Sequence, residues 1–251
     1  VYSLNGEVVG KIDVPDGFNM PVRMDLIKRA VLAIQSRRFQ PQGRDPMAGK
    51  KTTAQSRGVG LGMARIPRVK GGGTRGAGQG AFAPGTVGGR LAHPTRLEKK
   101  IVKRINKKEK KLALRSAIIA TAKKDLVKKR GHRVEEVKYL PIIVEKSIDE
   151  IKNTKRLKDV LIKIGLANEF IRMEDGRKIK AGRGKSRGRR IKQSKGPLLV
   201  VCEDKGIRKA ASNIPGMDVS SVEKLNAELL APGAKPGRLT VWSEDAFRKL
   251  S

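Results

Sequence analysis

The sequence predicts an α/β fold, with one globular domain whose mainly parallel sheet is flanked by helices, plus a long extended basic loop. Two observations carry this prediction. After residue 98, short apolar runs alternate with segments of helical spacing, a pattern typical of parallel strands covered by helices. Residues 40–97, by contrast, show neither helical nor strand periodicity, which is unusual inside a compact domain. We therefore expect a globular domain over 1–39 and 98–251, with the loop inserted in it.

The first elements are predicted from turn and cap residues. Asn5 and Gly6 suit a tight hairpin turn within residues 1–14. Asp25 is placed to cap a helix that runs to about Arg38, because apolar residues follow it at helical spacing.

The first helix after the loop is expected to begin at a capping box. Asn106 and Glu109 have the required spacing, and the helix would run to about Ala122. Its first turns are basic, although acids suit a helix N-terminus better. We therefore expect an anionic partner there, namely RNA, for Lys107, Lys108, Lys110, Lys111 and Arg115.

The remaining elements complete the alternation of strands and helices. A buried strand is expected at 142–144, further strands at 198–202 and 239–242, and a weak strand at 219–222. Helices are expected from Thr154 to a closing Gly165, over 207–212 and 227–230, and after a cap at Ser243.

The charge balance restricts the partners. The 251 residues hold 57 Lys and Arg against 24 Asp and Glu, a formal net charge of +33. Such a charge opposes compaction unless a polyanion lies beside it, either nucleic acid or an anionic membrane surface. The longest apolar runs, such as 198–202, are far shorter than the ~18 residues of a membrane span. No basic segment followed by an apolar stretch opens the chain, so we expect no signal peptide. Nucleic acid is favoured.

Two tracts concentrate the cations. The loop at 40–97 has one acid, Asp45, and 14 of the 28 glycines. Like charges stay disordered until a counter-charge orders them, so we expect the free loop to be disordered. The alternative is a solvated linker, but the tract lies between segments with core patterning. Its predicted contacts to nucleic acid are Arg44, Lys50, Lys51, Arg57, Arg65, Arg68, Lys70, Arg75, Arg90 and Arg96.

The second basic tract, residues 176–195, has ten cations and no acid. It also lies between two patterned segments. We expect it to form a second phosphate-binding surface through Lys180, Arg183, Lys185, Arg187, Arg189, Arg190 and Lys192.

Enzyme motifs are incomplete. The glycine runs at 58–62 and 76–80 read G-x-G-x-G, whereas a dinucleotide site needs G-x-G-x-x-G after a strand. Gly184 to Ser186 matches the end of a P-loop, but Ile179 occupies the position of its first glycine. No catalytic pair can be nominated, so we expect no enzyme and no catalytic residue.

Metal and cofactor sites are not expected either. The chain has one cysteine, Cys202, and two histidines, His93 and His132, which are too few ligands for a zinc site. Cys202 ends an apolar run and is expected to be a small buried side chain. Each histidine is expected to make a polar or RNA contact. A single cysteine excludes an intrachain disulfide and fits a reducing cytosol.

The scarcity of aromatic residues indicates how the chain would bind nucleic acid. Aromatic residues make up 3% of the chain, which argues against binders that stack bases on aromatic platforms. The remaining mode of binding is contact with phosphates through cations and backbone amides, together with recognition of shape. A DNA-architectural protein and a basic α/β enzyme are the alternatives. The first predicts no preference for folded RNA, and the second predicts saturable nucleotide binding.

Several motifs in order along the chain closely resemble the universal large-subunit ribosomal protein L four family, in its archaeal and eukaryotic form. In the loop they are QPQGRDP at 40–46, GMAR at 62–65, GQGAF at 78–82, GGR at 88–90 and AHP at 92–94. Later they are NKKEK at 106–110, AGRGK at 181–185, RGRR at 187–190, KGPL at 195–198 and ELLAPG at 228–233.

The resemblance implies a structural protein of the cytoplasmic ribosome. It implies that the loop runs into large-subunit rRNA, supports assembly, and ends at the nascent-peptide exit tunnel near ribosomal protein L twenty-two. By position, the segment at the tunnel and close to the nascent peptide would comprise Arg75, Gly76, Gly78, Gln79, Gly80 and Phe82, and less directly residues 63–70.

Overall fold

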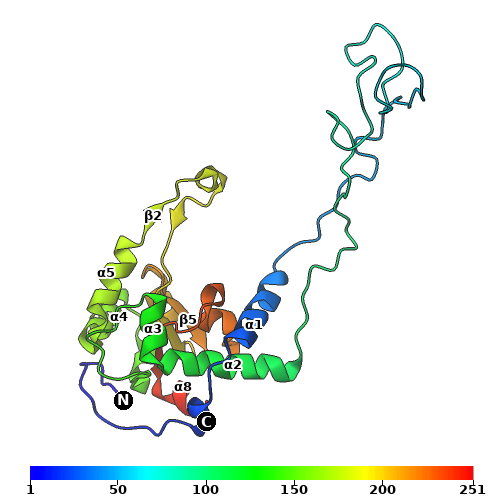
Figure 1. Ribbon diagram of the computed structural model, residues 1–251. Helices are drawn as coiled ribbons and strands as arrows, with labels where there is room; N and C mark the ends of the chain where they lie inside the picture. Colours follow the sequence, from blue (N-terminus) through cyan, green and yellow to red (C-terminus); the bar gives the residue numbers. More distant parts are fainter. Residues whose placement is uncertain (251) are drawn as a thin grey trace. The chain divides into compact units, whose positions relative to one another are not determined.

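The computed structural model describes residues 1–250 and divides the chain into two compact units. One unit comprises Val1–Gln35 and Lys103–Ser251, and the other comprises Ser36–Val102. We call the first the head and the second the loop unit (Figure 1).

The head is built on a four-stranded parallel sheet. Its strands are β1 (Ile142–Val144), β4 (Leu198–Val201), β5 (Asp218–Ser221) and β6 (Thr240–Ser243), in the spatial order β1-β6-β4-β5. All three pairings are parallel. The predicted α/β fold with a mainly parallel sheet is confirmed.

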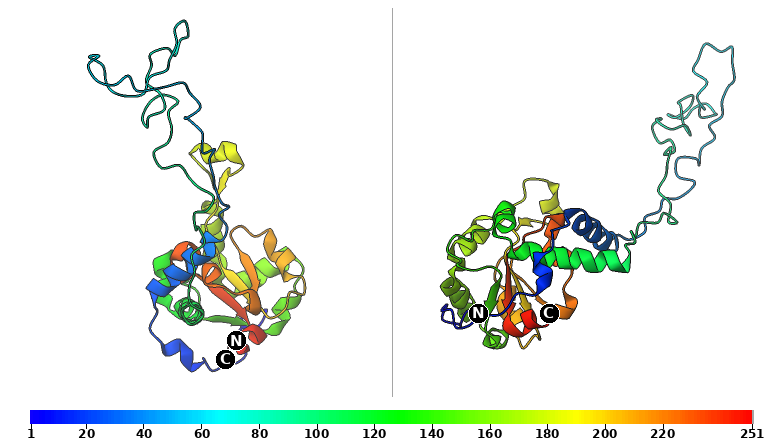
Figure 2. Two further views of the ribbon diagram at one scale, coloured as in Figure 1. Left: turned by 90° about the vertical axis from the view of Figure 1, so that its right-hand side faces the viewer. Right: turned by 60° about the horizontal axis from the view of Figure 1, so that its bottom comes forward.

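Helices cover both faces of this sheet, because successive strand residues point to opposite sides. Leu199 and Val201 enter one core, while Leu198 and Val200 enter the other. The first core is covered by α4 (Thr154–Leu161), α5 (Ala167–Asp175) and α6 (Ile207–Ser212). The second is covered by α1 (Met24–Ser36), α2 (Lys107–Ala122), α7 (Ala227–Leu230) and α8 (Glu244–Arg248). The head is thus a three-layer sandwich (Figures 1 and 2).

Shorter elements join these layers. They are the helix α3 (Lys124–Arg130), the 3-10 turns at Asp16–Asn19, Lys146–Glu150, Val222–Lys224 and Pro232–Ala234, and a π turn at Ile162–Leu166. The second basic tract forms its own antiparallel hairpin from β2 (Lys178–Ile179) and β3 (Ile191–Lys192), with a 3-10 turn at Arg183–Arg187 between them.

Several predicted caps are wrong in detail. Helix α1 begins at Met24, so Asp25 lies inside its first turn and pairs with Arg23 at 2.8 Å; the helix also ends at Ser36, before Arg38. Asn153, not Thr154, caps α4, because the Lys155 backbone N–H donates to Asn153 Oδ1 at 2.9 Å.

Two further predicted caps occupy the right position without the expected bond. The side chain of Asn106 makes no capping hydrogen bond in α2, and Glu109 instead pairs with Arg29 at 3.1 Å. The Ser243 hydroxyl contacts Asp149 Oδ2 at 3.4 Å and does not cap α8.

The N-terminal hairpin is smaller than predicted. Gly6 adopts a positive φ of 87° and donates to Ser3 O at 3.1 Å, which closes the expected turn. Beyond it, Tyr2 makes a single antiparallel bridge to Val8 and a parallel bridge to Val144 of β1. Tyr2 therefore attaches the N-terminal segment to the edge of the parallel sheet.

Candidate nucleic-acid interface

The cations of the loop unit are mostly open to solvent. Lys50, Arg68 and Arg90 are half-buried, and the other seven predicted contacts are exposed: Arg44, Lys51, Arg57, Arg65, Lys70, Arg75 and Arg96. The acid Asp45 accepts the Met47 backbone N–H at 2.9 Å and pairs with Lys51 at 3.1 Å. These two contacts hold the pKa of Asp45 below its usual value. The remaining positive charge is left for an external anion.

A crossing of three chain passes organises the middle of this unit. We call it the junction, and it comprises Gln55, residues 67–69 and residues 78–81. The backbones of Gln55 and Arg68 exchange two hydrogen bonds of 3.0 Å, and the Val69 N–H donates to Gln79 O at 3.0 Å. Arg68 Nη1 also donates to Gly78 O at 2.8 Å. Arg68 therefore joins its own pass to the two others: its backbone bonds Gln55, and its side chain bonds Gly78.

Two arms leave the junction. The first arm, residues 57–65, is closed where Ser56 Oγ donates to Arg65 O at 3.1 Å. It alternates glycine with the exposed apolar residues Val59, Leu61 and Met63. The second arm, residues 70–77, is closed where the Gly78 N–H donates to Val69 O at 3.1 Å.

The segment predicted at the exit tunnel is divided by this arrangement. Arg75 is exposed on the second arm and Gly76 is half-buried there, whereas Gly78, Gln79 and Gly80 belong to the junction. Phe82 follows with a positive φ of 65° and 36% of its surface exposed. The arms, not the junction, present the most open surface of these segments.

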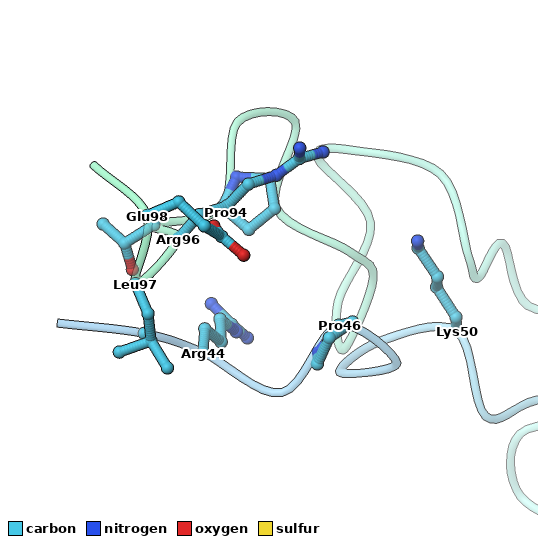
Figure 3. A pocket seen from close by; sticks show the side chains of 9 residues that line it. Arg44, Pro46, Lys50, Pro94, Arg96, Leu97 and Glu98 are labelled. Carbon is cyan, nitrogen blue, oxygen red and sulfur yellow. The ribbon is translucent and has the colours of Figure 1, made fainter. Parts of the chain in front are cut away.

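A pocket of about 590 Å³ lies between the first and last passes of the loop unit (Figure 3). Residues 43–50 supply one wall and residues 94–98 the other. Of the predicted contacts, Arg44, Lys50 and Arg96 come together here. Sequence reasoning did not find the pocket. The only feature of the sequence that could have indicated the pocket is the proline in each of the two passes, Pro46 and Pro94.

The second basic tract is ordered as a two-faced hairpin. Ile179 lies opposite Ile191 and Lys178 opposite Lys192, and the Lys180 N–H donates to Arg190 O at 2.9 Å. Neighbouring cross-strand pairs point to opposite faces. The cation pairs therefore share one face and the isoleucines occupy the other. Of its predicted contacts, Lys180 is half-buried and the rest are exposed: Arg183, Lys185, Arg187, Arg189, Arg190 and Lys192.

A buried ionic cluster holds the base of this hairpin. Arg172 Nη2 donates to Lys195 O at 2.8 Å, and Arg172 also bonds Glu169, which is fully buried. His132 Nδ1 lies 2.6 Å from Glu169 Oε1. Burial lowers the pKa of His132, although its contact with Glu169 acts in the opposite direction. His132 thus makes the polar contact that was expected of it, with a residue that no sequence pattern indicated.

Two other kinds of site, metal centres and membrane spans, are absent from the described residues. Among residues 1–250, no group of three His, Cys, Asp or Glu side chains is placed to hold a metal ion. The described helices include none that is long and apolar enough to cross a bilayer. Cys202 is half-buried, not fully buried as predicted. It lies just beyond the C-terminal end of β4, where the strand leaves the sheet.

Comparison with known protein families shows which family the chain belongs to. The family described as the ribosomal protein L4/L1 family matches residues 12–251. The chain belongs to the ribosomal protein L4/L1 family. Members of this family are structural proteins of the ribosome, so the prediction that the chain is not an enzyme is confirmed.

Archaeal relatives align with the chain over nearly its full length. A large ribosomal subunit protein uL4 of Methanosphaera stadtmanae is 48% identical over 250 residues, covering 100% of this chain and 95% of the relative. The uL4 of Sulfurisphaera tokodaii is 47% identical, covering 99% and 93%. That of Pyrobaculum aerophilum is 48% identical, covering 100% and 88%. The predicted archaeal and eukaryotic form of the L4 family agrees with these relatives.

Proposed function

We propose that the chain is a structural constituent of the large ribosomal subunit, in the cytoplasm, where it binds large-subunit rRNA. One observation carries the proposal. Seven of the ten loop cations predicted to contact nucleic acid are exposed, and Asp45 is already neutralised by Lys51. Such a surface is stable beside a dense polyanion and repels itself without one. Membership of the L4/L1 family supports rRNA as this polyanion.

The two basic segments have different tasks in this proposal. The loop unit threads between packed RNA helices, where its glycines allow the RNA backbone to approach closely. The hairpin over 178–192 places Lys178, Lys192, Lys180 and Arg190 on one face, to contact phosphates. Neighbouring ribosomal proteins complete the surroundings.

The loop also helps to line the nascent-peptide exit tunnel, near ribosomal protein L twenty-two. The family resemblance supports this role. The arms support it physically, because they expose glycines and the apolar residues Val59, Leu61 and Met63 between their cations. A wall of this kind lets a nascent peptide pass without strong binding. Arg75 on the second arm and Phe82 beyond the junction are the residues we place closest to the peptide.

Reconstitution of the large subunit tests the proposal. The complete chain, and a variant in which a short Gly-Ser linker replaces residues 43–97, are each added to rRNA with the other large-subunit proteins. The complete chain is expected to sediment with mature particles. The linker variant is expected to bind through its head but to leave particles immature. Mature particles without the chain would contradict a role in assembly, and absence of the complete chain from particles would contradict the proposal as a whole.

A further inference from the structure

The pocket between the first and last passes of the loop unit has the chemistry of a nucleotide site. Arg44 and Lys50 come from the first pass, and Pro94, Arg96, Leu97 and Glu98 from the last (Figure 3). Its volume of about 590 Å³ falls within the ~300–1,000 Å³ of small-ligand pockets. The space suits one nucleotide and is too small for an RNA helix.

We propose that this pocket receives one unstacked nucleotide of the rRNA. Arg44, Lys50 and Arg96 would hold its phosphate, while Pro46, Pro94 and Leu97 would pack against its base. The inference rests on the proposed function, because it takes rRNA as the partner. It adds a local mode of recognition that phosphate contact alone does not provide.

The charge of the pocket selects an anion. Three cations and one carboxylate line it. Among the described residues, none of Arg44, Lys50 and Arg96 has an ion-pair partner, since Asp45 is occupied by Lys51. An Arg guanidinium binds phosphate oxygens with two parallel hydrogen bonds and also stacks on bases. The apolar walls then distinguish a nucleotide from a bare phosphate.

The pocket is formed by contacts within the loop unit itself. A Cβ built on Gly43 would approach the Leu97 Cγ to 2.8 Å, so a larger residue at position 43 would have to displace the Leu97 side chain. Gly49 has a φ of 76°, and its Cβ would lie 2.5 Å from the backbone of Gly89 and Arg90. Two glycines therefore allow close packing between the first and last passes of the loop unit.

Glu98 gives the pocket a preference among bases. An ionised carboxylate only accepts hydrogen bonds, and the described residues give Glu98 no donor. The exocyclic amino groups of cytosine, adenine and guanine supply one. Uracil has two carbonyls around its single N–H, which a carboxylate disfavours. We therefore expect a base with an amino group.

The test measures the affinity of the full chain for three RNA hairpins that share one stem. One stem is fully paired, one carries a single bulged cytidine, and one carries a bulged uridine. The bulged cytidine is expected to bind about tenfold more tightly than the paired stem, which corresponds to about 1.4 kcal/mol. The bulged uridine should lie between them.

Three variants separate the walls from the charge. Leu97→Ser should lower the affinity for the bulged RNAs to that for the paired stem. Glu98→Gln should remove the preference of cytidine over uridine. Arg57→Gln is the matched control, because Arg57 is exposed on the first arm outside the pocket. It should weaken binding of all three RNAs by the same factor.

A crosslinking measurement keeps the proposal testable if Leu97→Ser loosens the loop. A 4-thiouridine in the bulge should crosslink within residues 43–50 or 93–98 of the wild-type chain. Crosslinks only elsewhere, or equal wild-type affinity for all three hairpins, would overturn the inference. Binding of large-subunit rRNA in preference to DNA would then still stand, so failure of the pocket is distinguishable from failure of the proposed function.

Discussion

Leu97 lies directly against the backbone of Gly43, 54 positions earlier in the chain, and a Cβ on Gly43 would meet its Cγ at 2.8 Å. The contact joins the first and last passes of the loop unit and sets the width of the pocket between them. The Leu97 side chain occupies the space that a Cβ would take at Gly43. Neither residue stands out in the sequence, yet together they bring Arg44 and Arg96 to the same pocket.

Gly43→Ala should therefore weaken rRNA binding several-fold without unfolding the head. The added methyl group forces the Leu97 side chain out of its place against the first pass, because a 2.8 Å carbon contact is too short to persist. Filter binding measures the affinity, and thermal denaturation followed by circular dichroism measures the head. Gly72→Ala is the control, since nothing lies within 4 Å of a Cβ at Gly72. Equal affinities of the two variants would show that the contact has no role.

Gly78→Val should impair assembly of the large subunit. Gly78 has a φ of 74°, which a β-branched residue adopts only under strain, and it accepts the hydrogen bond from Arg68 in the junction. Because Gly78 belongs to the loop unit, the melting temperature of the head should not change. Gly76→Val serves as the comparison, since no atom lies within 4 Å of its Cβ and its φ is not positive. An unfolded head in the Gly78 variant would refute the division into two units.

Replacing Arg183, Arg187 and Arg189 by glutamine should lower the salt dependence of rRNA binding. Each lost phosphate contact reduces the slope of log affinity against log salt by about 0.7–0.9. The triple variant should therefore lose roughly 2 to 3 from the slope. Lys155, Arg156 and Lys163, which are exposed on or near α4, make a control triple with the same charge change. An unchanged slope in the hairpin variant would mean that this segment does not contact phosphates.

Arg238→Met should destabilise the head by about 3–5 kcal/mol, the usual effect of breaking a buried ion pair. Arg238 is fully buried and donates to Asp218 Oδ2 at 2.7 Å, Gly196 O at 2.8 Å and Leu229 O at 2.9 Å. Its loss leaves a carboxylate and two carbonyls without these donors. Urea denaturation gives the free energy of unfolding. Arg248→Met removes an exposed pair with Glu244 and should have little effect; a similarly small effect for Arg238 would be unexpected.

Asp149→Asn should stabilise the head near pH 7. Burial raises the pKa of Asp149 to about 6, above its unfolded value of ~3.9. The protonated form is therefore favoured by folding, and its contribution is present below pH ~4 and lost as the pH rises to about 6. The asparagine variant avoids this loss, by on the order of 2 kcal/mol. Urea denaturation of both proteins at pH 4 and pH 7 checks it: the stability difference should appear only at pH 7.

Strands β1 and β4 of the sheet were predictable because each is a short apolar run with clear ends. Residues 198–201 and 142–144 are buried on both faces, so they are continuously apolar and cannot be mistaken for an amphipathic surface. The weaker strand β5 begins at Asp218, one residue before the predicted start, because that polar residue bonds Arg238.

Two helices escaped prediction. Helix α3 contains only Leu126 and Val127 as apolar side chains among basic residues, which gives no helical stripe. Helix α5 buries Glu169, which contacts His132 from 37 positions earlier in the chain as well as Arg172 of the same helix. Local patterns do not contain such long-range partners. The cations of the interface were visible as charge, but the pocket and the junction depend on close backbone approaches that only folding reveals.

Binding to purified large-subunit rRNA and to duplex DNA, each titrated across salt, tests the central claim most directly. Phosphate contacts make both affinities fall steeply with salt. Specific recognition of folded RNA predicts that the rRNA stays bound at salt concentrations that release the DNA. Coincident curves would contradict the claim and would show that the positive charge of the chain acts without regard to RNA structure.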